Sequence, residues 1–226
     1  AQKLYAILEK PMVGQDKTIR LLSFDLTNRR WDEEIYAYEL EPEGRSVDAL
    51  VWVGGNRFLA LERDGKEADL NAHKMIFTIT LNTETKTVTK EPLVDLMHIF
   101  DPNGLAQDGM EGDLGRGPLF SLPFSSIGGL AILDRRHVAL VNDNNYPLGR
   151  GRHVKADQPD DSEFVITSDT IIKNDDVKVI KNKGMPYNNN SNVYGDLIIK
   201  FNIIYPDKIN MEHYDVLKQI LGKSIF

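Results

Sequence analysis

Two closely similar stretches of this chain each end in three polar residues that could take part in chemistry. Residues 50–64 and 130–144 align without a gap, and each pattern predicts two strands joined by a turn. The triplets are Glu62, Arg63 and Asp64 in the first stretch and Asn142, Asp143 and Asn144 in the second. Clustered oxygen ligands suit calcium, and calcium beside an arginine suits a phosphate ester.

The triplets therefore predict one site with two kinds of residue. Asp143, Asn144 and Glu62 are the candidate ligands of Ca²⁺, and Arg63 is the candidate that binds an anionic substrate. The alternative is that Asp and Asn form turns by bonding their own backbone. No catalytic residue is assigned. The sequence holds no Gly-x-Ser-x-Gly elbow, no phosphate-binding Gly-rich loop and no His-x-x-x-His pair.

Repetition also indicates the fold that must position this site. A third, shorter copy of the second strand runs over residues 4–10, and short alternating strands lie between the copies. Repeated four-strand units are typical of a β-propeller, and about three blade-like units are visible, so a partial β-propeller is predicted. A glycine-rich insertion interrupts the repeat, and we expect its acidic residues Asp108, Glu111 and Asp113 to be solvated.

The composition changes abruptly near residue 167. All eleven arginines lie at or before Arg152, whereas the last sixty residues hold ten isoleucines and eight asparagines. Such a break indicates two joined parts, which we place at residues 1–166 and 167–226. The alternative is a chance fluctuation in a surface-rich tail.

Charge and cysteine content exclude several classes of partner. The net charge of −7 lies almost wholly in the first part, with 19 basic and 27 acidic side chains against 8 and 7 in the second. Without a basic stripe, no nucleic-acid partner is expected. No apolar run approaches the roughly 18 residues of a membrane span, so no membrane association is expected. The absence of cysteine excludes disulfides and cysteine-bound zinc.

The second part is predicted to be a small β subdomain with a C-terminal helix. Residues 176–181 and 195–206 form its strands, and Asn210 can cap a helix over residues 211–221. One face of this helix is apolar and is expected to contact a partner or a second copy, the alternative being the subdomain's own sheet. The residues of this face are Tyr214, Leu217, Ile220 and Leu221.

A specific pattern runs through residues 121–134, 138–148 and 160–166, with Asn-Asp-Asn-Asn-Tyr-Pro as its most distinctive run. It resembles the phytase-like family, described as esterase-like activity of phytase, over about residues 3–166. The resemblance implies hydrolysis of a small ester or phosphoester. One departure matters, because Gly128 stands where that family usually has an acidic residue. A catalytic or metal-binding acid at that position would be missing.

Two blocks in the second part follow one another in order: Lys-Gly-Met-Pro at residues 183–186, then Gly-Asp-Leu-Ile-Ile-Lys-Phe-Asn-Ile-Ile-Tyr-Pro at residues 195–206. With the helix, they resemble the end of the DnaJ-type co-chaperone C-terminal domain over about residues 169–226. The resemblance implies binding of unfolded client proteins and dimerisation. The His-Pro-Asp loop, the zinc module and most of the client-binding region are absent, so the part resembles a fragment of that domain.

Three functional interpretations stay open, and they leave open whether the chain is an enzyme. The first is hydrolysis of an ester or phosphoester by an incomplete phytase-like part. The second is a DnaJ-type fragment that binds unfolded protein or self-associates. The third is a chimera, an artificial or misassembled fusion without integrated activity. The two resemblances also imply different compartments, secreted or periplasmic for the first part and cytoplasmic for the second.

Overall fold

Strands, turns and loops make up the described part of the chain in the computed structural model. The structure describes residues 2–101, 104–106, 109–154, 159, 161–168, 177–180, 185 and 195–200. No helix lies among these residues and the named strands pair antiparallel, so the prediction of a mainly β fold is confirmed. In the same residues no membrane-crossing helix is found. The predicted helix over residues 211–221 and its apolar face lie outside them.

The chain divides into two compact units, Ala1–Ile171 and Ile172–Phe226. The first unit contains β1 (Lys3–Ile7), β2 (Thr18–Asp25), β3 (Arg30–Glu39), β4 (Ser46–Gly54), β5 (Arg57–Arg63), β6 (Lys74–Leu81), β7 (Val88–Asp95), β8 (Ile99–Phe100), β9 (Leu119–Phe120), β10 (Ser126–Ile132), β11 (His137–Asp143) and β12 (Phe164–Ser168). The second contains β13 (Val177–Ile180) and β14 (Leu197–Lys200).

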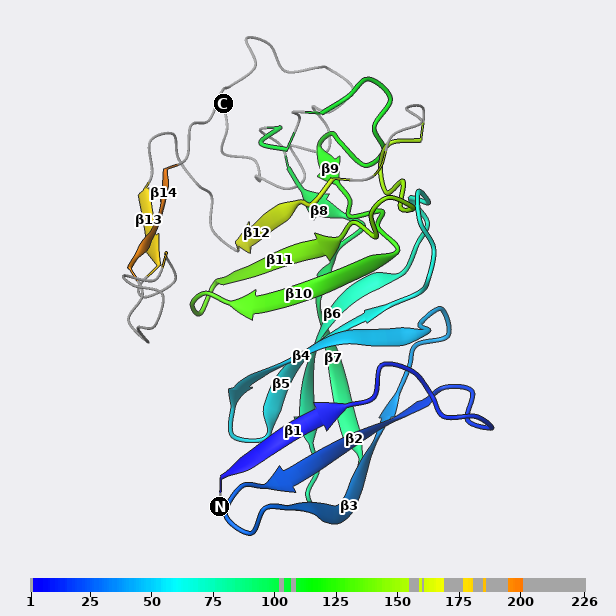
Figure 1. Cartoon of the computed structure of the whole chain (residues 1–226), viewed down its shortest axis with the longest axis vertical. Helices are drawn as coiled ribbons and strands as arrows, with labels where there is room; N and C mark the ends of the chain where they lie inside the picture. The colour runs from blue at the N-terminus through cyan, green and yellow to red at the C-terminus, as the bar shows by residue number, and fades with distance from the viewer. Residues whose placement is uncertain are drawn as a thin grey trace, which may run out of the picture. The chain divides into compact units, whose positions relative to one another are not determined.

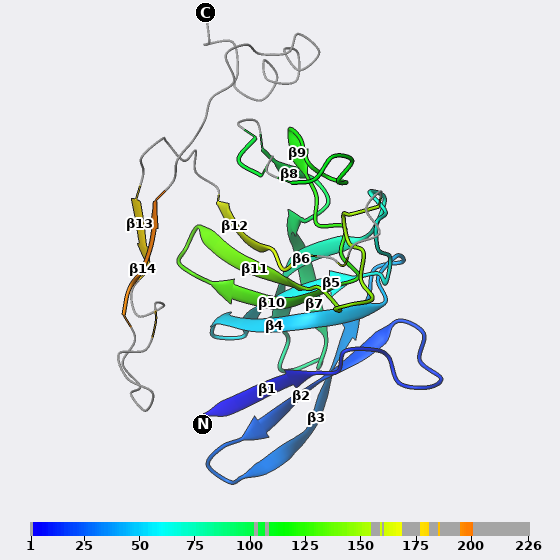
Figure 2. The ribbon, with the colours of Figure 1, turned by 45° about the horizontal axis from the view of Figure 1, so that its top comes forward.

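Three antiparallel sheets form the body of the first unit. Their strand orders are β1-β2-β3, β4-β5-β6-β7 and β10-β11-β12, and β8 pairs with β9 in a small separate sheet. Each sheet follows the order of the sequence, so neighbouring strands in a sheet are also consecutive along the chain. Within this unit, Figures 1 and 2 show β4 lying between β1 on one side and β10 on the other.

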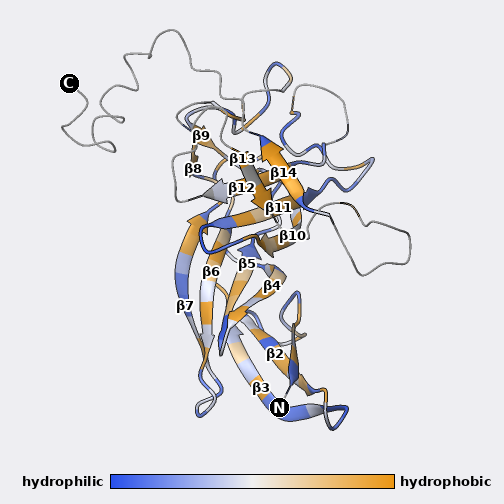
Figure 3. Cartoon of the chain, turned by 90° about the vertical axis from the view of Figure 1, so that its left-hand side faces the viewer, coloured by the Kyte–Doolittle hydropathy of each residue, from blue (hydrophilic) through white to orange (hydrophobic). Residues whose placement is uncertain are grey.

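The four-stranded sheet is the middle layer and is buried on both faces. Side chains alternate across a strand, so Phe58 and Ala60 of β5 enter one core while Leu59 and Leu61 enter the other. Partners in the first core include Ile19, Leu21, Tyr36 and Tyr38 of the β1-β2-β3 sheet, and partners in the second include Ile127 and Leu140 of the β10-β11-β12 sheet. Figure 3 shows the corresponding apolar segments, in orange, along β2, β5 and β6.

The two similar sequence stretches fold alike, which confirms the predicted hairpins. β11 covers the positions that the gap-free alignment pairs with β5, from end to end, and β4 and β10 begin at the aligned residues Ser46 and Ser126. Both first strands also carry a register shift at the same place, between Val47 and Ala49 in β4 and between Ser126 and Gly129 in β10. A bulge re-aims the side chain it contains.

The second unit is described over one hairpin. Val179 of β13 lies opposite Ile198 of β14, and Val177 lies on the same face. Val177 is 55% exposed, Val179 44% and Ile198 66%, so the hairpin presents an exposed apolar face.

Candidate functional site

A cavity of about 470 Å³ lies where β1, β4 and β10 approach one another. Its polar wall is formed by Glu9, Asp48, Arg63 and Ser126, and its apolar wall by Tyr5, Ala6, Ile7, Val47, Ala49 and Leu50, with Gly128 also lining it. The walls come from all three sheets of the first unit. This cavity is the candidate functional site, because it combines apolar surface with a few convergent polar groups.

Asp48 connects two of the three sheets at this cavity. It lies in the bulge of β4, and its Oδ2 atom accepts hydrogen bonds from the Ser126 hydroxyl and the Ile127 N–H of β10, both at 3.2 Å. The same oxygen accepts a bond from Arg63 Nε at 2.5 Å, and the Asp48 side chain is only 5% exposed. Asp48 is the position that the repeat pairs with Gly128.

Arg63, the predicted substrate-binding residue, lies in the cavity wall with its side chain 12% exposed. Nη1 donates to the carbonyl oxygen of Asp64 at 3.0 Å, and Nε is held by Asp48. No hydrogen bond of Nη2 is found within the described part of the chain, and its ion-pair partner, Glu9 Oε1, is 3.7 Å away. The guanidinium is therefore fixed at one end and keeps N–H groups for an anion at the other.

Glu62, a predicted calcium ligand, lies on the opposite face of the middle sheet from β10. It shares the β5 face of Phe58 and Ala60, which points to the first core. Its side chain is fully buried, and its two oxygens accept bonds from the Tyr38 hydroxyl, Lys90 Nζ and the backbone N–H of residue 41 at 2.7 to 2.8 Å. Gly44 packs so closely that a Cβ there would collide with this carboxylate.

The charge of Glu62 is stabilised by its neighbours. Burial alone would raise its pKa, but His73, Lys90 and Tyr38 together hold the pKa of Glu62 below its ordinary value. In return, burial and the adjacent carboxylate raise the pKa of Tyr38 strongly. Lys90 Nζ also lies 4.3 Å from the centre of the Phe77 ring and 4.9 Å from that of Tyr38. Glu62 thus belongs to a buried polar network within the first core.

Asp64, which ends the first triplet, neutralises a buried lysine. Its Oδ1 atom lies 2.5 Å from Nζ of Lys74, whose side chain is fully buried. Burial alone would raise the pKa of Asp64, but the lysine and the backbone N–H groups of His73 and Lys66 lower it. Burial lowers the pKa of Lys74. The pair ties β6 to the loop after β5.

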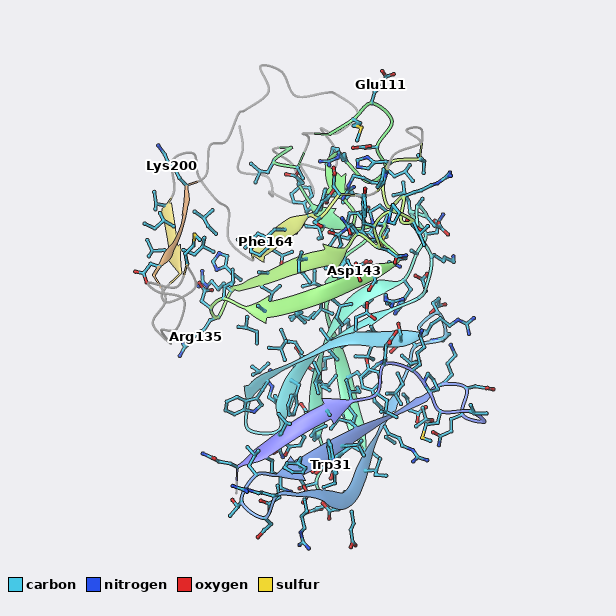
Figure 4. All side chains as sticks on the ribbon, in the orientation of Figure 1. Trp31, Glu111, Arg135, Asp143, Phe164 and Lys200 are labelled. Atoms are coloured by element: carbon cyan, nitrogen blue, oxygen red, sulfur yellow. The ribbon has the colours of Figure 1, made fainter. Side chains whose placement is uncertain are left out.

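Asp143 and Asn144, the other predicted calcium ligands, lie at the carboxyl end of β11, where Figure 4 labels Asp143. Asp143 Oδ1 accepts a bond from the N–H of Asn145 at 3.0 Å, and Asn144 Oδ1 accepts one from the N–H of Tyr146 at 3.2 Å. The structure thus brings these two residues together but places Glu62 in a different layer. Across the described ranges, no group of three or more His, Asp or Glu side chains is arranged to hold a metal ion.

A second polar cluster orders the loops beside β9. His153 is 1% exposed; its Nδ1 lies 2.7 Å from Asp113 Oδ1 and its Nε2 lies 3.1 Å from Asp161 Oδ2. Arg152 is fully buried, bonds both carboxylate oxygens of Glu163 and lies over the rings of Phe120 and Phe124, 4.9 and 5.1 Å from their centres.

This cluster corrects one sequence expectation. Asp113 was expected to be a solvated loop residue, yet its side chain is 3% exposed because it accepts bonds from His153 and from the N–H of Met110. Glu111 is exposed, as expected, and Asp108 lies outside the described residues. Spacing along the chain gives no sign of the cluster, since Asp113 and His153 meet only through the packing of two loops.

Comparison with known families gives two matches, one to each part of the chain. The family model described as esterase-like activity of phytase matches residues 1–146, and the chain belongs to this phytase-like family. The model of the DnaJ C terminal domain matches residues 145–206. Both resemblances found in the sequence are thereby confirmed. Comparison with curated proteins and with solved structures gives no match.

Proposed function

We propose that the phytase-like unit binds and hydrolyses a small anionic ester, a phosphoester or an acyl ester with a charged group, in the cavity between β1, β4 and β10. The observation that carries this proposal is the placement of Arg63. It lines the cavity, is fixed by Asp48 and keeps, at Nη2, N–H groups that make no hydrogen bond within the described chain and face only the Glu9 carboxylate at 3.7 Å. Arginine held in this way suits an oxyanion that binds with two parallel hydrogen bonds.

The other cavity residues suit the remainder of such a ligand. Tyr5, Ile7 and Leu50 offer apolar contact for an organic group, while Asp48 keeps the guanidinium in a single orientation. A preorganised cation of this kind stabilises negative charge that develops on an ester oxygen during hydrolysis. Calcium held by Asp143 and Asn144 stays a prediction. The catalytic acid or base is not assigned.

The test is binding and turnover by the full chain. Phenyl phosphate binding is measured by calorimetry, and release of p-nitrophenolate from p-nitrophenyl phosphate reports hydrolysis. Arg63→Ala is expected to weaken binding by about 10- to 100-fold, the range for losing hydrogen bonds to a charged group. Arg57→Ala is the matched control, since Arg57 is exposed on the same strand and does not line the cavity. Equal binding by wild type and Arg63→Ala would refute the proposal.

We also propose that the three sheets of the first unit are blades of a partial β-propeller. Three features support this assignment: the repeated hairpin, the shared bulge position, and the stacking of three sheets with β4 between β1 and β10. In a propeller, the innermost strands of successive blades surround a central channel. The cavity would then be part of that channel.

A second candidate function concerns the DnaJ C-terminal domain, which suggests binding of client proteins in general. The apolar face of Val177, Val179 and Ile198 favours it, since exposed apolar side chains gathered on one face mark interaction surfaces. The proposed ligand is an unfolded polypeptide segment. The alternative, a fusion without integrated activity, predicts that neither ligand binds.

Client binding is tested with a permanently unfolded protein, reduced and carboxymethylated α-lactalbumin, by fluorescence anisotropy. Ile198→Asp is expected to weaken binding by about tenfold or more, because burying an aliphatic side chain contributes about 1.5–3 kcal/mol. Val13→Asp is the control, as Val13 is a fully exposed apolar residue of the first unit. Unchanged affinity in Ile198→Asp would remove this face from client binding.

A further inference from the structure

The N–H groups of Arg63 are unevenly used, and this unevenness identifies a place for an anion. Nε and Nη1 are engaged with Asp48 and with the backbone oxygen of Asp64. Nη2 instead faces Glu9 across 3.7 Å, which is longer than a hydrogen bond. The position beside Nη2 is therefore occupied by the Glu9 carboxylate, which is near enough for electrostatic attraction to Arg63 but too far for a hydrogen bond.

Glu9 is held in a way that lets its side chain leave this position. Its backbone carbonyl accepts a bond from the N–H of Val47 at 2.9 Å, which fixes the main chain beside β4. Its carboxylate is 57% exposed and forms an ion pair, at 3.3 Å, with Lys10, whose side chain is 65% exposed. Exposed ion pairs of this kind stabilise a structure little, so the side chain can rotate outward without moving the backbone.

Asp48 and Glu9 play different parts although both are acidic and both line the cavity. The Asp48 side chain is 5% exposed and bonded to Arg63, Ser126 and Ile127, so it cannot be displaced without breaking the contact between sheets. Glu9 makes no hydrogen bond with its carboxylate within the described part of the chain. A ligand can replace only the second of these acids.

We propose that Glu9 is a specificity-determining residue that occupies, in the free protein, the place of the ligand's anionic group beside Arg63. A phosphate or carboxylate group of the ligand displaces the Glu9 side chain and bonds Nη2. The Glu9 carboxylate then stays at the cavity rim and repels additional negative charge. This inference rests on the proposed function and names the residue that sets its selectivity among anionic ligands.

The experiment measures phenyl phosphate binding to the full chain by calorimetry. Glu9→Gln removes the competing charge and is expected to tighten binding by about tenfold, because like charges placed close together weaken association. The gain is expected to be larger for phenyl phosphate, a dianion at pH 8, than for benzoate, a monoanion. Glu43→Gln is the matched control, with the same change in net charge at an exposed acid that does not line the cavity.

Each outcome decides a different question. Tighter binding in Glu9→Gln, lost again in Glu9→Gln/Arg63→Ala, supports the role of Glu9. Wild-type binding that depends on Arg63 but is equal or weaker in Glu9→Gln overturns the inference and leaves the proposed function standing. Absence of binding in both wild type and Glu9→Gln overturns the proposed function, and the inference with it.

Discussion

At the scale of single residues, the protonation of His153 is linked to the stability of the loops that it joins. Burial alone would lower its pKa, but the hydrogen bonds and charges of Asp113 and Asp161 outweigh burial and raise the pKa of His153 above 6.5. A raised histidine pKa stabilises the fold below the unfolded value and loses that contribution as pH rises through the folded value. Burial alone would raise the pKa of Asp113, but His153, the N–H of Met110 and Arg116 lower it below 3.8, so its contribution is lost only in stronger acid.

The loop cluster should therefore contribute most to stability between about pH 4 and 6.5, the ordinary values of an aspartate and a histidine. His153→Gln is expected to lower the melting temperature more at pH 5.5 than at pH 8, as measured by circular dichroism. His98→Gln is the control, because His98 pairs with Asp95 while its side chain is 60% exposed. A loss that is equal at both pH values would show that the His153 charge does not stabilise the loops.

Calcium binding is a separate prediction at this scale. If Asp143 and Asn144 hold calcium, a hundredfold excess over the dissociation constant stabilises the wild type by about 2.7 kcal/mol, by mass action. Asp143→Ala then loses that gain, as measured by urea unfolding with and without calcium. The same calcium effect in wild type and variant would assign the two side chains to the turn that they form with Asn145 and Tyr146.

Asp48 shows why part of the site was missed from the sequence. Aligning the two hairpins pairs Asp48 with Gly128, so the acid that the β10-β11 hairpin lacks is present in the β4-β5 hairpin. This signal lies at the start of the first strand of each hairpin, whereas the predicted site residues lie at the polar end of the second strand. The bulge then turns Asp48 toward Ser126 of the next sheet, and a bulge cannot be located from alternation of polar and apolar residues alone.

At the scale of elements, repetition predicted the strands, whereas the direction of each side chain depends on the alternation along its strand. The aligned stretches become β4-β5 and β10-β11 with matching ends and a matching bulge. Glu62 and Arg63 were taken as neighbours in one site, yet adjacent strand residues point to opposite faces. In a sheet buried on both faces, the sequence does not say which face reaches the cavity, because both alternating sets are apolar. Arg63 lines the cavity and Glu62 is in the first core.

The helix predicted over residues 211–221 also belongs to this scale. If Leu217 lies on a face that covers a second copy, Leu217→Asp shifts a dimer strongly toward monomer, because burying a leucine contributes about 1.5–3 kcal/mol. Sedimentation of wild type and variant over a concentration series measures this shift. Lys218→Asp is the control, since Lys218 is not on the predicted apolar face. A wild type that is monomeric throughout would mean that the face packs within its own chain.

At the scale of the whole molecule, three criteria place the junction of the two parts at different residues. The family models meet at residues 145–146, the composition changes near residue 167, and the first compact unit extends to Ile171. The difference between the first two criteria and the last has a structural cause: β12 (Phe164–Ser168) pairs with β11 and completes the β10-β11-β12 sheet. A strand that lies within the DnaJ match is therefore part of the packing of the phytase-like unit.

The segment after residue 146 should accordingly be required for the first unit to fold. It supplies β12 and also Arg152 and Glu163, a buried ion pair that bonds the backbone of Leu114 and Ser121. A fragment of residues 1–171 is expected to unfold cooperatively on heating. A fragment of residues 1–146 is expected to show no cooperative transition, because a typical domain is stable by only about 5–15 kcal/mol and this fragment loses an entire strand and a buried cluster.

Calorimetry of the two fragments measures this difference, and Arg152→Met/Glu163→Met in residues 1–171 separates the contribution of the ion pair from that of β12. Replacing both partners leaves neither charge of the pair buried alone, so the double variant is expected to stay folded. Glu163→Met alone leaves the buried Arg152 without its carboxylate partner, and this is expected to lower the free energy of unfolding by about 3–5 kcal/mol. If residues 1–146 unfold as cooperatively as residues 1–171, the end of the family match is also the end of the folding unit. The pairing of β12 would then be an addition to a unit that is already stable, and the junction would lie before it.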